Sequence, residues 1–296
     1  MILFAMYLHL GLADSPSIGS ALLVAISLAI ACAVLSVFVV SRRWAFIGEG
    51  ISHSGFGGAG TAWLLALAFP AVFDRPWVPY AGVVVFSLAT ALAIGYLTRR
   101  NRVDSDTAIG IFLVASVAWG VLAQQIYFLK TGRLPTAWAT FFFGQMESVS
   151  WTFAAGATAV CVAVVAVVAF LGKEIVAYSF DPALAEASGV PARMIHYLLM
   201  LLVALTIVIG VRVAGNLLIP ALLVLPGATA LQLATRLSAV VTSSVIVGLL
   251  GSVVGIAVRW HWPAIPTGPA IVLTLFVLFV AALVLRRVSP SGDASN

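Results

Sequence analysis

The sequence predicts an all-α protein, a polytopic membrane helical bundle of about eight or nine transmembrane helices with a short cytoplasmic helix. Of its 296 residues, 62% are hydrophobic and 8% are charged, whereas charged residues make up about 25% of a soluble domain. The mean hydropathy is +1.15, and several apolar runs reach the roughly 20 residues that cross a hydrocarbon core about 30 Å thick. The polar alternation of a membrane β-barrel is missing. These observations exclude an ordinary cytosolic protein and favour one integral membrane domain over residues 1–296.

Taken in order, the apolar runs predict nine spans. They cover residues 19–41, 45–68, 80–98, 108–129, 151–171, 195–213, 215–233, 239–258 and 268–285. Two places leave alternatives open, because residues 130–150 allow a re-entrant piece and two spans almost touch at Val213 and Ala214. The first twelve residues carry no Lys or Arg, which favours a short interfacial segment over a cleaved signal peptide.

The distribution of cations predicts the orientation of the chain. If the first span runs inward, ten of the 15 Lys and Arg lie at ends on one side: Arg42, Arg43, Arg99, Arg100, Arg102, Lys173, Arg193, Arg236, Arg286 and Arg287. The positive-inside rule then places the N-terminus outside and the C-terminus in the cytoplasm of a cell inner (plasma) membrane. The cations are too scattered to form the basic stripe of a nucleic-acid-binding protein.

The loop over residues 174–193 is the one cytoplasmic connection long enough to fold. Asp181 precedes Pro182, and proline suits a first helical position because it lacks only a donor that would be unpaired there. Gly189 with Pro191 closes the helix. We therefore expect a cytoplasmic helix of about two turns, serving as a docking surface for a partner; the alternative is a plain linker between spans.

Two kinds of site are missing from the sequence. Cys32 and Cys161 lie inside apolar runs without C-x-x-C spacing, so they predict small buried thiols and no disulfide framework or zinc knuckle. The two lysines, Lys130 and Lys173, do not stand in a G-x-x-x-x-G-K-[ST] phosphate loop. A motor for ATP-driven transport would therefore be a separate polypeptide.

Glu49 and His53 are the strongest candidates for chemistry inside a span. A charged residue at a helix centre costs about 2.5–3.5 kcal/mol in the membrane, so each one suggests a function. Spacing of four residues puts both on one helical face, about 9 and 15 Å from Arg43 along a continuous helix. A carboxylate with an imidazole suits Mn²⁺, Fe²⁺ or Zn²⁺ and suits Cu⁺ poorly. The alternative is an internal hydrogen bond that only packs the bundle.

Two donors are too few for a tight metal site, and pairing across a two-fold axis would supply two Glu and two His. The glycines at positions 48, 50, 55, 57, 58 and 60 predict close approach of neighbouring helices. Elsewhere, His196 suggests an interfacial residue, Asp104 and Asp106 suggest helix capping, and Asn216 with Pro220 predicts a kinked or broken helix.

These residues resemble the permease subunits of the metal-type ABC importers, the family for zinc, manganese and iron uptake. The stretch from Arg42 to His53, RRWAFIGEGISH, is similar to the family signature R-R-x-x-x-x-G-D-x-x-S/A-H. Further similar stretches follow in the same order: DTAIGI (106–111), FFG (142–144), SFDPALA (179–185) with GVP (189–191), and LLVLPGATA (222–230). The likeness covers about residues 19–288.

The resemblance implies a transmembrane permease that moves Mn, Zn or Fe into the cytoplasm, without enzymatic activity or a cofactor of its own. It implies a metal path at Glu49 and His53, a second permease copy or paralogue, an extracytoplasmic metal-binding protein, and cytoplasmic ATPases that bind ATP. The ATPases would dock on the 174–193 coupling segment, at Phe180, Asp181, Pro182, Ala183, Leu184, Ala185 and Gly189. Glu49 departs from the family's usual Asp by one methylene, which leaves the metal open.

Two other classes compete with this interpretation. In a proton-coupled secondary metal transporter, Glu49 or His53 would carry the coupled proton. In an intramembrane hydrolase, Ser52 or Ser54 would act with His53. Adjacent residues on a helix point in different directions, so the hydrolase would need a further partner.

Overall fold

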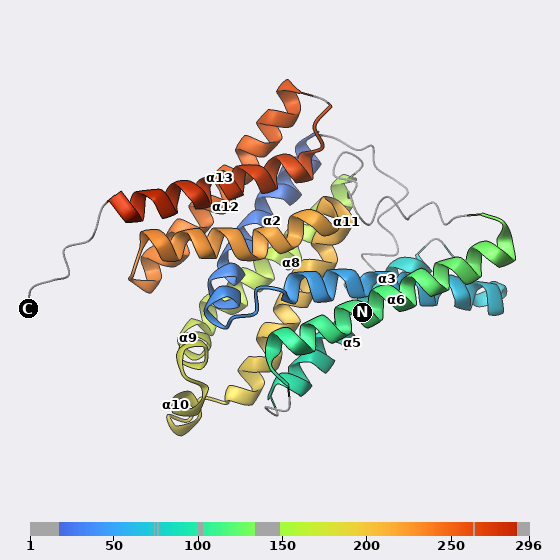
Figure 1. Ribbon diagram of the computed structural model, residues 1–296, viewed down its shortest axis with the longest axis horizontal. Coiled ribbons are helices and arrows are strands. Elements are labelled where there is room, and N and C mark those ends of the chain that lie inside the picture. The colour runs from blue at the N-terminus through green and yellow to red at the C-terminus, as the bar shows by residue number, and fades with distance from the viewer. Residues whose placement is uncertain are drawn as a thin grey trace, which may run out of the picture.

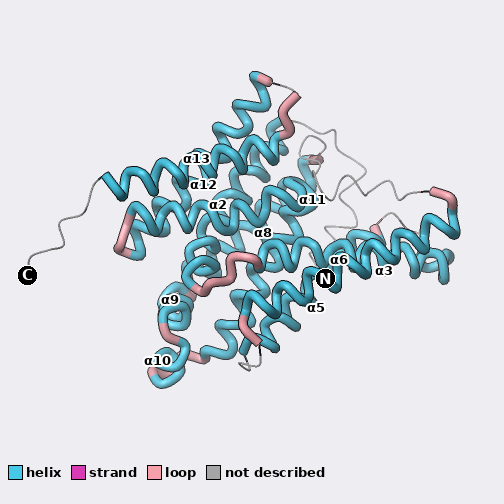
Figure 2. Tube along the Cα trace, in the orientation of Figure 1, coloured by secondary structure: helices cyan, strands magenta, loops and turns pink. Residues whose placement is uncertain are grey.

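We describe the protein from a computed structural model. The structure describes residues 18–73, 75, 77–99, 103–133, 149–262 and 264–288. The predicted interfacial segment at the N-terminus, Arg100, Arg102, the FFG stretch at 142–144 and nearly all of the possible re-entrant piece lie outside this part. The described residues form helices joined by short connections and contain no strand (Figure 2).

The helices are packed as one bundle, shown in chain order by the colours of Figure 1. Their bounds are α2 (Ile18–Ser41), α3 (Ile47–Ala68), α4 (Pro70–Phe73), α5 (Val78–Arg99), α6 (Ser105–Thr131), α8 (Trp151–Phe170), α9 (Gly172–Phe180), α10 (Pro182–Ala187), α11 (Ala192–Leu233), α12 (Leu237–His261) and α13 (Thr267–Val288).

Seven of the described helices are long and apolar enough to cross a membrane: α2, α5, α6, α8, α11, α12 and α13. The predicted all-α membrane fold is therefore confirmed. The predicted span 45–68 corresponds to α3, whose polar and glycine-rich first half lowers its hydropathy below that of the other long helices. The predicted spans 195–213 and 215–233 both lie in α11.

Helix α11 is broken at Gly215. Its 42 residues would extend about 63 Å as one straight helix, about twice the hydrocarbon thickness. Gly215 has φ 76° and ψ 174°, a backbone conformation that glycine adopts without steric cost, and Figure 1 shows the chain turning sharply there. The break falls next to the predicted boundary at Val213 and Ala214, so α11 provides two spans in place of one.

Helix α3 is enclosed by α5, α6 and the second half of α11. Glycines form the contacts: a Cβ atom on Gly48 would lie 3.0 Å from the Cα atom of Pro220 in α11, and one on Gly50 would lie 2.7 Å from Cγ2 of Ile109 in α6. A Cβ atom on Gly58 would overlap the carbonyl oxygen of Gly82 in α5. The predicted close approach at these glycines is therefore present, and it places the least apolar long helix in the interior.

The short helix predicted within residues 174–193 is present as α10, and a further short helix, α9, precedes it. The chain continues from α8 into α9 after Leu171 alone, and α10 follows as a second short helix. Asp181 caps α10 as expected: its Oδ1 atom accepts hydrogen bonds from the backbone N–H groups of Ala183 (2.9 Å) and Leu184 (3.0 Å). Pro182 is at the start of the helix, and Gly189 has φ 86° just after its end.

The glycine contact between α3 and α5 can be tested with Gly58→Ala. We expect the free energy of unfolding to fall by about 1–3 kcal/mol, because the added methyl group would overlap backbone that cannot move aside. The measurement is thermal unfolding of the purified protein in detergent. Gly110→Ala in α6 is the matched control, since a Cβ atom there meets nothing within 4 Å, and it should be neutral or stabilising. Equal melting temperatures for the two variants would contradict the packing argument.

Candidate functional site

Glu49 and His53 form a hydrogen-bonded pair in the first turns of α3. The Nε2 atom of His53 lies 2.9 Å from Oε2 of Glu49, with the i, i+4 spacing expected from the sequence. His53 also stacks on Phe56, with ring centroids 5.7 Å apart and an interplanar angle of 24°. Helix α3 thus brings a carboxylate and an imidazole within reach of one small ligand.

The pair occupies the open strip of an otherwise buried helix segment. Between Ile47 and Gly60, Glu49 and His53 are the two residues that are not buried, with 36% and 24% of their side chains exposed. The Nδ1 atom of His53 is buried and has no hydrogen-bond partner. Ionisable groups do not face hydrocarbon at low cost, so this strip must face a polar path or another protein chain.

The assumption of one continuous helix from Arg43 to His53 is wrong, because residues 42–46 form turns that connect α2 to α3. Measured from Ile47, the two residues lie about 3 and 9 Å along the axis of α3. The start of α3 is nevertheless inside the bundle. Gly48 contacts Pro220, which lies about 20 Å from the C-terminal end of α11 at Leu233.

The pair supplies two donors, and no cluster of three or more His, Cys, Asp or Glu side chains occurs among the described residues. Neither neighbouring serine is hydrogen-bonded to His53. The hydroxyl of Ser52 donates to the carbonyl of Glu49 (3.1 Å), and that of Ser54 donates to the carbonyl of Ile51 (2.5 Å). This arrangement suits weak, transient binding of a ligand. It lacks the serine–histidine contact of a hydrolase.

The predicted docking residues form a small exposed platform on α9 and α10. Phe180 and Leu184 are 77% and 64% exposed, whereas Ala185 is buried and holds α10 against the bundle. In Figure 1 the two short helices protrude at the lower left, away from the α12–α13 connection at the top. Phe180 ends α9 and Leu184 lies on α10, so two large apolar side chains are exposed on adjoining short helices, as is typical of an interaction surface.

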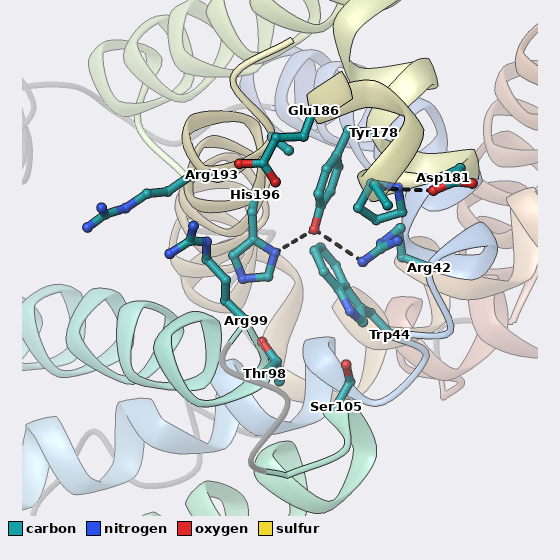
Figure 3. A pocket seen from close by; sticks show the side chains of 13 residues that line it. Arg42, Trp44, Thr98, Arg99, Ser105, Tyr178, Asp181, Glu186, Arg193 and His196 are labelled. Atoms are coloured by element: carbon teal, nitrogen blue, oxygen red, sulfur yellow. Dashed lines mark hydrogen bonds between the residues drawn. The ribbon is translucent and has the colours of Figure 1, made fainter. Parts of the chain in front are cut away.

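A buried chain of hydrogen bonds lies beneath this platform, and sequence reasoning missed it. His196 was expected at the membrane interface, but it is 4% exposed and both ring nitrogens are bonded (Figure 3). Its Nε2 atom lies 2.9 Å from the carbonyl oxygen of Gly95 and its Nδ1 atom 2.6 Å from the hydroxyl of Tyr178. An Nη2 donor of Arg42 lies 3.2 Å from the same hydroxyl.

The carbonyl of Gly95 fixes the direction of this chain of hydrogen bonds. A carbonyl only accepts, so Nε2 of His196 carries the proton and Nδ1 accepts from Tyr178. Burial raises the pKa of the Tyr178 phenol, and the Arg42 guanidinium opposes that rise; the hydroxyl therefore stays protonated and can donate. These hydrogen bonds join the α2–α3 turn, α9, α11 and α5. The four elements are distant in sequence, so no local spacing of residues reveals the contacts between them.

The arrangement defines a class: an apolar helical bundle with an open ionisable pair and an exposed platform of short helices is typical of a membrane transport permease. The chain belongs to the ABC 3 transport family, whose model matches residues 14–286. The resemblance seen in the sequence is therefore confirmed.

Named relatives support the same assignment. The chain is 33% identical to the manganese transport system membrane protein MntC of Halalkalibacterium halodurans, over 88% of this chain and 85% of that one. It is 29% identical to the chelated iron transport system membrane protein YfeD of Yersinia pestis, over 94% and 88% of the two chains. Among solved structures, PsaBC from Streptococcus pneumoniae in complex with Fab has a chain with a TM-score of 0.72, 29% identity and 90% coverage of both chains.

The buried chain of hydrogen bonds can be tested with Tyr178→Phe. Removing the hydroxyl leaves the His196 Nδ1 atom without its donor, so we expect a loss of about 1–3 kcal/mol in stability. Tyr197→Phe is the matched control, since no hydrogen bond to the Tyr197 hydroxyl is present in the described part of the chain. Thermal unfolding of both variants in detergent decides the point, and the same melting temperature for both would contradict the role of the Tyr178 hydroxyl.

Proposed function

We propose that this chain is the transmembrane permease of an ATP-driven importer that carries a divalent transition metal ion into the cytoplasm past Glu49 and His53. The observation that carries the proposal is the exposure of this pair on a helix whose neighbouring residues are all buried. The names of two relatives, a manganese and a chelated iron transport system membrane protein, support a metal cargo.

The donor types support a first-row divalent ion. A carboxylate oxygen and an imidazole nitrogen suit Mn²⁺, Fe²⁺ or Zn²⁺. The ion is cargo, so it must leave as readily as it enters, and two ligands from one chain favour weak binding. Glu49, with its longer side chain in place of the family's Asp, adds reach and leaves the choice among the three metals open.

A second permease copy would complete the path. Two chains related by a two-fold axis would bring two Glu49 and two His53 together, and the exposed strip would then face a central path in place of lipid. We further propose that an extracytoplasmic metal-binding protein delivers the ion. The cationic span ends, including Arg42, Arg99 and Arg193, support a cytoplasmic position for α9 and α10 under the positive-inside rule.

The motor would be a separate cytoplasmic ATPase seated on α10. ATP-linked closure of the motor would move α9 and α10, and the Tyr178–His196–Arg42 contacts would pass this movement to the turn before α3. Access to Glu49 and His53 would then alternate between the two sides of the membrane.

The metal path can be tested with Glu49→Ala and His53→Ala in the complete importer reconstituted into liposomes. We expect each substitution to lower the uptake of Mn²⁺, Fe²⁺ or Zn²⁺ by about tenfold or more, since losing a metal-site group commonly costs 10–100-fold. His261→Ala is the matched control, because this histidine is exposed at the end of α12. Unchanged uptake in both α3 variants would contradict the site.

The same liposomes separate this mechanism from a proton-coupled secondary transporter. ATP on the side of the vesicle membrane that carries the ATPase should be required for uptake. An imposed pH gradient alone should not drive uptake. Uptake driven by the gradient without any ATPase would favour the secondary transporter.

The docking platform can be tested with Leu184→Glu on α10. A charge at this exposed apolar position should weaken binding of the ATPase by about tenfold or more, because apolar anchors dominate interface energies. Leu233→Glu is the matched control, since Leu233 is 50% exposed at the end of α11 and is outside the platform. Binding is measured by titrating labelled ATPase onto the permease in nanodiscs, and equal affinities for the two variants would contradict docking on α10.

A further inference from the structure

A cavity of about 490 Å³ lies beside the docking platform. Its walls come from the α2–α3 turn, the end of α5, the start of α6, α9, α10 and the start of α11. Figure 3 shows Tyr178 in the middle of the cavity, with Arg99 and Arg193 on one side and Arg42 on the other. Three arginines from three separate parts of the chain therefore contribute to the lining of one space.

These arginines have no carboxylate partner. The one ion pair within 4 Å among the described residues joins His53 to Glu49, although Asp181 and Glu186 also line the cavity. Asp181 is occupied by capping α10. Arg42 is the most constrained of the three, because its Nε atom is buried without a hydrogen-bond partner while its guanidinium carbon lies 4.6 Å from the centroid of the Tyr178 ring.

The one buried donor of these arginines without a hydrogen-bond partner is Nε of Arg42, and Arg99 and Arg193 are exposed. Their combined positive charge favours an anionic ligand with planar oxygens. Guanidinium groups bind carboxylates and phosphates through parallel N–H donors, which gives both strength and orientation. Thr98 and Ser105 add hydroxyl groups to the same cavity wall. A volume of this size exceeds one ordered water and falls within the range of ligand pockets, about 300–1,000 Å³.

We propose that this cavity receives an acidic side chain, Asp or Glu, from the ATPase that docks on α10; the inference rests on the proposed function. Residues of α10 and of the adjoining start of α11 supply much of the wall, and Phe180 and Leu184 on the same short segment expose the apolar platform. A protein docked on that platform would lie next to the cavity. The apolar contacts would then supply buried interface area, and the arginines would supply charge complementarity and fix the register of the two proteins.

Occupation of the cavity would also reach α3. Arg42 donates to Tyr178 and precedes Trp44, which is buried and packs edge-on against His196 with ring centroids 5.5 Å apart. A carboxylate bound to the Arg42 guanidinium would fix this side chain against Tyr178. The turn that begins α3 is thereby coupled to the docked state of the ATPase.

The test uses the double charge reversal Arg99→Glu with Arg193→Glu in the full-length permease. The permease is placed in nanodiscs and titrated with its labelled partner ATPase. Both arginines are exposed, so folding should survive; Arg99→Gln with Arg193→Gln is a milder second variant. We expect affinity to fall about tenfold or more for the reversal, and the dependence of affinity on salt to flatten. Arg287→Glu, exposed at the end of α13, is the matched control and should change affinity less than about twofold.

Position is tested by cross-linking. Ser105→Cys in the cavity wall should form a disulfide with cysteine placed at one acidic position of the ATPase, and not with cysteines at its other acidic positions. Affinities equal to that of the unaltered permease for both arginine double variants would overturn the inference.

A lipid headgroup is the competing occupant and gives a different result. If the arginine variants lose affinity in discs of phosphatidylglycerol but match the unaltered protein in discs of phosphatidylcholine, the cavity binds lipid phosphate and the inference is wrong. Leu184→Glu separates the two levels of argument: if it weakens ATPase binding while the arginine variants do not, docking on α10 stands and the acidic contact fails. If neither weakens binding, docking on α10 fails as well.

Discussion

The structure depends on the cost of keeping Glu49 and His53 inside a membrane bundle. A charged group at the centre of a membrane helix costs about 2.5–3.5 kcal/mol, and α3 reduces this cost in two ways. The two side chains bond to each other at 2.9 Å, and the rest of the helix is withdrawn from lipid because its glycines let α5, α6 and α11 approach closely. Between Ile47 and Gly60, only the strip that carries the pair stays open. Close glycine packing and an open polar strip are therefore two consequences of one requirement.

The enclosure of α3 also decides how its movement can be controlled. A helix held on three sides cannot shift alone, so force must enter at its ends. At the N-terminal end of α3, the α2–α3 turn is fixed by buried Trp44 and by Arg42, which reach His196 and Tyr178. Tyr178 belongs to α9 and His196 to the start of α11. These hydrogen bonds thus join the exposed platform to the start of α3 through elements distant in sequence.

Sequence reasoning could predict what depends on local spacing. The i, i+4 pair, the Asp181–Pro182 cap and the boundary near Val213 all follow from residues within about two turns of each other, and the structure contains each of them. It could not predict where α3 begins, because a compact turn at residues 42–46 stands in place of the continuous helix that was assumed. It also misplaced His196, whose partners Gly95 and Tyr178 lie 101 and 18 residues away. Burial of a histidine near a span end is decided by such long-range partners, which leave no periodic signal.

The internal bond between Glu49 and His53 bears directly on the proposed metal path. An arriving ion would compete with the 2.9 Å contact, so part of its binding free energy would be used to separate the two side chains. After release of the ion the pair would close again, which would lower the cost of the empty state. A site of this kind binds less tightly than one with preformed ligands, and weaker binding favours release. For a permease whose cargo must pass through, a pair that satisfies itself between transport events is better suited than a rigid set of four free donors.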